Sequence, residues 1–260
     1  MKLYEQIRPE LLDEIKILSQ KNKISLFEKI RKETDMLNLK SLLTEAHFGI
    51  YFDKIGINLK YNNKVFKQND LAPDFTFLKN SQEIIAEVCR INPTDQDMKV
   101  QEAEDRAIEE FRTNNPGVPN MGGYHSITWK PSRLSGENSS MSLKANKYGT
   151  LAEQVNAPLL LCIYLDFVSG HNALDLNHSL YGSPAEFYGE FGFEEYYPHS
   201  PFHDLSNALF YTNEQMRKNV SGILLRNNNG SFNYYHNFSP SNKLNDDNAQ
   251  YFLGMQYPYE

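Results

Sequence analysis

Hydrophobic positions recur at helical spacing near the start of the chain. Leu11, Ile15 and Leu18 share one helix face, which predicts a helix over 4–19 with Pro9 in its first turn. A second helix is expected to begin at Ser25, because Ser25 and Glu28 have the spacing of a capping box. It is expected to run to about Phe52 with a kink near 35–38. The first fifty residues are therefore predicted to be mainly helical.

The apolar period changes to two after Gly56. Alternating positions predict strands at 57–61, 64–66, 74–78 and 83–91, and the short polar turns between them predict a strand meander. A capped, highly charged segment over 94–114 is typical of an amphipathic helix with one solvated face. The meander and this helix are predicted to follow the N-terminal helices.

The second half of the chain alternates between loop-rich and strongly apolar segments. Residues 115–138 are mostly loop, with one strand candidate at 124–129. Further elements are predicted by apolar runs and turn residues: a helix at 142–156, a buried strand at 159–167, and a hairpin of 220–226 with 232–236. Residues 168–204 are interpreted as an insertion over one end of the sheet. The polar stretch from Asn237 is expected on the surface.

These elements predict one α/β domain over residues 1–260. Its parts are a helical extension at 1–38, a core at 39–167, the insertion at 168–204, and a C-terminal hairpin and tail at 205–260.

Composition and charge exclude several classes of protein. The 260 residues have a net charge of -7 and a mean hydropathy of -0.59, as in ordinary soluble domains. The longest apolar run, 157–165, is too short to cross a bilayer, and charged residues interrupt the N-terminus where a secretory signal would be apolar. We therefore expect no membrane association and a cytoplasmic location. The two cysteines lie in apolar runs, which disfavours a disulfide framework or a zinc ribbon.

Two acidic residues stand out in the meander. Asp74 begins one predicted strand and Glu87 lies near the end of the next, so the turn between them brings the two carboxylates together. An unpaired carboxylate is costly to bury, and a pair converging from apolar strands implies a cation between them or a wet cleft. Oxygen ligands of this kind suit Mg²⁺ or Mn²⁺. The alternative for Asp74 is simple turn chemistry, and the alternative for Glu87 is a buried ion pair.

The residues around these acids resemble a known motif. Pro73-Asp74, twelve intervening residues and then Glu87-Val88-Cys89 resemble the PD-(D/E)xK motif of the restriction-endonuclease-like nucleases. The order helix, three-strand meander, helix, strand over 39–167 is similar to that family's core. The resemblance implies a bound Mg²⁺ or Mn²⁺ held by the carboxylates of Asp74 and Glu87 and the main-chain carbonyl of Val88, with Glu45 of the preceding helix reaching it directly or through water.

Cys89 departs from the motif, because the family has a lysine at this position and cysteine cannot supply its positive charge. The segment 142–154 resembles the family helix that carries a lysine and a downstream glutamine. Lys147 is therefore the first candidate for the missing charge, with Lys144 second and Arg90 third. Gln154 is seven residues after Lys147, on the same helix face, and is a candidate to contact substrate. The alternative for both lysines and for Gln154 is a solvated helix position, and Cys89 is interpreted as a small buried hydrophobe.

The motif predicts a Mg²⁺-dependent hydrolase, an endonuclease that cleaves nucleic acid, with DNA favoured over RNA. A homodimer would suit cleavage of both strands. Two alternatives stay open: a nuclease-like fold that has lost its chemistry and binds nucleic acid or a protein, and a scaffold in which the motif is accidental. His199 and His203 have a metal-ligand spacing, but Pro201 between them breaks the helix that such a pair would need.

Overall fold

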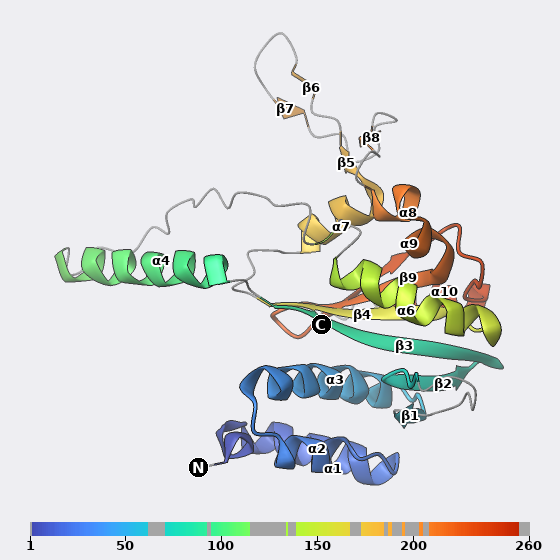
Figure 1. Ribbon diagram of the computed structural model, residues 1–260, viewed down its shortest axis with the longest axis horizontal. Helices are drawn as coiled ribbons and strands as arrows, with labels where there is room; N and C mark the ends of the chain where they lie inside the picture. Colours follow the sequence, from blue (N-terminus) through green and yellow to red (C-terminus); the bar gives the residue numbers. More distant parts are fainter. Residues whose placement is uncertain are drawn as a thin grey trace.

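The computed structural model describes residues 2–61, 71–92, 95–114, 134, 139–166, 173–184, 187–188, 194–195, 203–204 and 208–254. It confirms a mixed α/β fold built on a six-stranded sheet with the strand order β1-β2-β3-β4-β9-β10 (Figure 1). The strands are β1 (Leu59–Tyr61), β2 (Phe75–Lys79), β3 (Gln82–Ile91), β4 (Leu159–Leu165), β9 (Val220–Arg226) and β10 (Phe232–His236).

The sheet combines two antiparallel edges with a parallel centre. β1, β2 and β3 form the predicted antiparallel meander, and β9 and β10 form the predicted hairpin. β3, β4 and β9 run parallel to one another, with Glu87 opposite Leu161 and Leu161 opposite Ile223. The carboxyl ends of the three central strands therefore meet at one edge, where ligand sites are common in α/β proteins.

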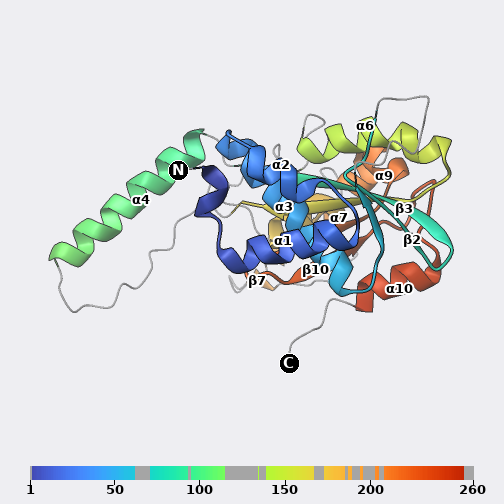
Figure 2. The same cartoon turned by 90° about the horizontal axis from the view of Figure 1, so that it is seen from below.

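Helices cover both faces of the sheet. On one side lie η1 (Leu3–Gln6), α1 (Pro9–Lys21), α2 (Leu26–Lys32) and α3 (Met36–Lys54); on the other lie α6 (Ser140–Gln154) and α9 (Glu214–Asn219), as two views show (Figures 1 and 2). α4 (Asp95–Asn114) projects from this body in both figures. The remaining elements are α7 (Ala173–Tyr181), α8 (Leu209–Thr212), α10 (Asp246–Gly254) and the two-residue strands β5 (Ser183–Pro184), β6 (Phe187–Tyr188), β7 (Glu194–Glu195) and β8 (His203–Asp204).

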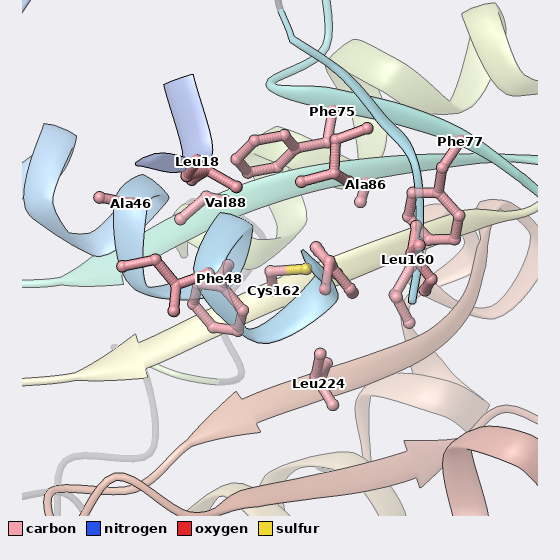
Figure 3. Packing of buried hydrophobic residues seen from close by; sticks show 14 of the residues in the cluster. Leu18, Ala46, Phe48, Phe75, Phe77, Ala86, Val88, Leu160, Cys162 and Leu224 are labelled. Atoms are coloured by element: carbon pink, nitrogen blue, oxygen red, sulfur yellow. The ribbon is translucent and has the colours of Figure 1, made fainter. Parts of the chain in front are cut away.

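The core on the α3 side is rich in aromatic rings. Phe48 and Phe52 of α3 are fully buried, and the Phe52 ring centroid lies 6.1 Å from that of Phe75. Phe48, Phe75 and Phe77 lie among aliphatic side chains in this core (Figure 3). Gly49 lets α1 approach closely, since a Cβ there would lie 2.9 Å from Cδ2 of Leu18. This packing fixes α3 against the sheet. The core on the α6 side is mainly aliphatic and includes Ile85, Cys89, Met141, Ala145, Leu151, Leu161 and Ile223.

Local sequence signals explain most of the helix ends. Pro9 lies in the first turn of α1 as predicted, but the single helix predicted over 4–19 is divided, with the 3-10 helix η1 ending at Gln6 and α1 beginning at Pro9. The side chain of Ser139 caps α6 by accepting from the Ser142 amide. The predicted capping box at Ser25 is wrong, because the Ser25 side chain accepts no capping hydrogen bond. The kink predicted near 35–38 is a complete break between α2 and α3. At the start of α3, Oδ1 of Asp35 accepts a hydrogen bond from the Asn38 amide at 2.8 Å.

The C-terminal segment differs from its prediction. Residues from Asn237 were expected on the surface, yet Leu244 and Phe252 are buried and α10 packs on β10. The Phe252 ring stacks on Tyr234 with centroids 5.6 Å apart. The predicted strands at 64–66 and 124–129, His199 and about half of the insertion lie outside the described residues. His203 begins the two-residue strand β8, so it is not on a helix, as Pro201 predicts. Within the described residues, no helix is both long enough and apolar enough to cross a membrane.

Candidate active site

The site lies where β3 extends beyond its neighbour. β2 pairs with residues 82–86 of β3, whereas β4 pairs with 85–91. On the β2 side, the second half of β3 therefore has no partner strand among the described residues. A pocket of about 230 Å³ occupies this position, lined by Ser41, Glu45, Asp74, Val88, Cys89, Arg90, Ser140 and Lys144. α3, the start of β2, β3 and α6 thus all contribute to one pocket.

The structure brings Asp74 and Glu87 into direct contact, as the meander predicts. Oδ2 of Asp74 accepts from the Val88 amide at 2.8 Å, and Oε2 of Glu87 accepts from the Asp74 amide at 3.2 Å. The two side chains therefore continue the hydrogen bonding where the β2 to β3 ladder ends. Glu87 is only 1% exposed and lies behind the pocket wall, whereas Asp74 and Val88 line the pocket itself.

Lys144 supplies a positive charge at this point. Its Nζ contacts Oε1 of Glu87, and its side chain is 32% exposed, so the lysine links the buried carboxylate to the pocket. Burial lowers the pKa of Lys144, but Glu87 and Asp74 outweigh burial and the net shift is upward. Lys144 therefore stays protonated at neutral pH. Lys147, the first candidate from the sequence, is exposed and lies 4.9 Å from the Tyr148 ring centroid, outside the set of pocket residues.

Glu45 approaches the pair from α3. The Tyr61 hydroxyl donates to Oε2 of Glu45 at 2.6 Å, and Nζ of Lys29 donates to the Tyr61 hydroxyl at 3.3 Å. This chain of contacts holds the Glu45 carboxylate on the pocket wall. Neither Tyr61 nor Lys29 was predicted, because their distance in the sequence from the motif gives no local signal.

The three carboxylates resist ionisation. Burial and then the negative charge of Asp74 raise the pKa of both Glu45 and Glu87 to about 7. Burial also raises the pKa of Asp74, although Lys144 opposes that shift. In the absence of further positive charge, the cluster therefore exchanges protons near neutral pH.

Cys89 and Arg90 behave differently from a catalytic lysine. Cys89 shares the α6 side of β3 with Glu87, as strand alternation predicts, but it is 2% exposed and burial raises its thiol pKa to about 12. It is therefore not an activated nucleophile. Arg90 points to the α3 side, where it contacts the Asp166 carboxylate and donates to the Lys40 carbonyl at 3.3 Å.

Two more residues on α6 complete the description. Gln154 ends α6, ten residues after Lys144, and is about 15 Å further along the helix axis, so the structure does not bring it to the pocket. Tyr148 was not predicted. Its hydroxyl lies 3.5 Å from the Ala72 carbonyl, and burial together with Glu87 and Asp74 raises its pKa. The sequence signal that could have identified Tyr148 is its spacing, because it follows Lys144 by four residues and so lies one helical turn further along the same face.

The net negative charge of Glu45, Asp74, Glu87 and Lys144 together would suit a divalent cation. Three carboxylates repel one another here, and Lys144 offsets one of them, so an ion with oxygen preference would relieve the remaining repulsion. The arrangement is not yet that of a metal centre: no group of three or more His, Cys, Asp or Glu side chains in the described ranges meets that geometry. An ion bound at Glu87 would have to share Oε1 with Lys144 or displace it.

Comparisons with models of protein families, with curated proteins and with solved structures find no match to this chain. The restriction-endonuclease-like core therefore stays a prediction that rests on the motif and on the residues of the pocket.

Proposed function

We propose that the protein is a metal-dependent phosphodiesterase that cleaves nucleic acid, with DNA as the favoured substrate, on a restriction-endonuclease-like core. The observation that carries the proposal is the meeting of Glu45, Asp74 and Glu87 with Lys144 at the open edge of β3. Three acids and one lysine at the end of an apolar strand match the chemistry that the motif implies. Lys144 on α6 takes the position in the mechanism that the family lysine would have at residue 89.

Each residue has a separate task in this proposal. Asp74, Glu87 and the Val88 carbonyl would hold Mg²⁺ or Mn²⁺, with Glu45 reaching it directly or through water. When bound, the ion would supply an activated water and offset charge on the phosphate. Lys144 remains protonated, so it stabilises negative charge and can donate a proton, but it does not act as a base. Glu45, if it contacts the ion only through water, is the side chain placed to accept a proton from that water.

The test is cleavage of plasmid and linear DNA with and without Mg²⁺. Asp74→Asn and Glu87→Gln should fold and lose cleavage, and Lys144→Met should lose on the order of 100-fold or more. Lys147→Met is the matched control, because it removes the same charge from the same helix outside the pocket. Lys144→Arg separates charge from folding, since it keeps the ion pair. Undiminished cleavage by the Asp74 and Glu87 variants would refute the assignment.

A catalytically inactive module that binds nucleic acid or a protein is the second candidate. Two observations favour it: Lys144 already neutralises Glu87, and a buried cysteine stands at the motif's lysine position. Calorimetry separates the two functions. Heat of binding for Mg²⁺ or Mn²⁺ that disappears in Asp74→Asn supports the enzyme, whereas DNA binding with no metal binding and no cleavage supports the module.

A further inference from the structure

A second pocket lies beside the pocket lined by Glu45 and Asp74, which we call the acidic pocket. The charged side chains that line the second pocket are basic. The second pocket has a volume of about 140 Å³ and is lined by Lys40, Thr44, His47, Arg90, Tyr164 and Arg226, together with Leu43. It lies on the α3 side of the sheet at the carboxyl ends of the three parallel strands. Arg90 lines both pockets, so the two are adjacent.

Strand register builds the floor of this pocket. Arg90 of β3 is paired with Tyr164 of β4, and Tyr164 is paired with Arg226 of β9, so the three side chains form one row across the sheet. The guanidinium carbons lie 5.3 Å and 5.5 Å from the centroid of the Tyr164 ring. The Tyr164 ring therefore has a guanidinium group on each side. These contacts position both guanidinium groups at the carboxyl-terminal edge of the parallel strands.

The positive charge of this row is only partly balanced. Arg90 is paired with Asp166, but Arg226 is half-buried and has no carboxylate partner among the described residues. Burial lowers the pKa of Arg226, and the Tyr164 hydroxyl, which is not a carboxylate, opposes that shift only in part. Lys40 adds an exposed ammonium at the rim, likewise without an ion pair in the described part of the chain. A half-buried guanidinium with no carboxylate partner loses part of its hydration, and an anion would offset that cost.

The pKa of His47 reflects the positive charge of this pocket. Burial and then Arg226 lower the pKa of His47 to about 4, so the imidazole is neutral at physiological pH. The other charged groups that act on His47 are Arg8 and Glu14 from the N-terminal segment and Lys54 at the end of α3, and only Glu14 is acidic. The charged groups that line this pocket are therefore all basic, whereas the neighbouring pocket is lined by Glu45 and Asp74 as well as by Arg90 and Lys144.

We propose that this basic pocket binds one backbone phosphate of a nucleic acid whose neighbouring phosphodiester reaches the acidic pocket. The inference rests on the proposed function and deepens it, because it assigns how the substrate is held. Guanidinium groups suit phosphate, since their planar N–H groups match its oxygens in pairs. Arg226 is the principal ligand, Lys40 supports it from the rim, and Arg90 connects the two pockets. The side chains are positioning residues that hold the chain and take no part in bond cleavage.

DNA binding in EDTA tests this proposal without cleavage. The affinity of a short fluorescent duplex is measured over a range of salt concentrations for the full chain and for Arg226→Gln. Loss of one phosphate contact should weaken binding and reduce the slope of log K against log salt by about 1. Arg217→Gln is the matched control, because it removes the same charge just before the opposite end of β9. An unchanged slope in a folded Arg226→Gln protein overturns the proposal.

A second variant guards against misfolding of Arg226→Gln. Lys40→Gln changes an exposed position on α3 and should also reduce the salt slope, whereas Lys54→Gln at the other end of α3 should not. Inorganic phosphate distinguishes the source of the ligand. If phosphate raises the melting temperature of the wild type but not of Arg226→Gln, while DNA affinity is equal in both, the pocket binds free phosphate and the proposal is overturned. Cleavage is measured separately with Mg²⁺, so an inactive protein that keeps the Arg226 effect contradicts only the proposed function.

Discussion

Replacing Glu45 with glutamine should stabilise the protein at high pH. The pKa of Glu45 rises from 4.5 to about 7 in the folded protein, first because of burial and then because of Asp74. The favourable contribution of the neutral carboxyl is complete below about pH 4.5 and is lost as the pH rises through 7. At about 1.4 kcal/mol per pKa unit, ionised Glu45 costs the folded state at most about 3 kcal/mol. Glutamine keeps an oxygen for the Tyr61 hydroxyl and carries no charge.

Urea unfolding in EDTA at pH 5 and pH 8 measures this effect. Glu45→Gln should exceed the wild type in free energy of unfolding by up to about 3 kcal/mol at pH 8, and the difference should shrink toward zero at pH 5. Glu153→Gln on the exposed side of α6 is the control for a change in net charge. A Glu45→Gln protein that is less stable than the wild type at pH 8, or that differs equally at both pH values, would refute the reasoning.

The same measurement reports on the metal. Adding Mg²⁺ at pH 8 should stabilise the wild type, because an ion that binds only the folded state shifts the unfolding equilibrium. The gain should be smaller in Glu45→Gln, since one carboxylate of the cluster is missing. Equal gains in both proteins would place the ion elsewhere.

The remaining predictions concern Cys89 and Asn237. Native protein should react with Ellman's reagent far more slowly than urea-unfolded protein, in which both cysteines react, because Cys89 and Cys162 are buried and burial raises both thiol pKa values; rapid release of one equivalent from native protein would contradict this. Asn237→Ala should lower the free energy of unfolding by about 1–3 kcal/mol, because the Asn237 amide donates to the carbonyls of Met216, Arg217 and Val220. Asn146→Ala, at an exposed helix position, should change stability by less than about 0.5 kcal/mol.

Local signals explain which parts of the fold were predictable. The turn before Ser231 contains Gly230 at a φ of 88°, a conformation that favours glycine, and it sets the register of the β9 to β10 hairpin. Asn80 and Ser81 similarly set the register that joins Asp74 to Glu87. The burial of α10 was not predictable in this way, because its polar sequence is matched by partners far along the chain, such as Asn248 with Lys79 at 3.1 Å.

The choice between two lysines shows the same limit. Helical spacing places Lys144 and Lys147 on neighbouring parts of one surface, and it does not say which of them faces β3. The rotation of α6 about its axis decides this, and that rotation is fixed by the burial of Met141, Ala145 and Tyr148 against the sheet. Only the packed structure therefore identifies Lys144 as the partner of Glu87.

The packing of α1 under α3 has a consequence for truncated versions of the protein. Ile15 and Leu18 are buried against the layer that carries Glu45, and Asn22 accepts from the Leu59 amide at 3.2 Å to hold the first strand in place. Removing residues 1–38 would remove the helices that pack against α3, the helix that carries Glu45. A minimal folded fragment must therefore retain these helices, and any effort to shorten the chain should begin from other segments.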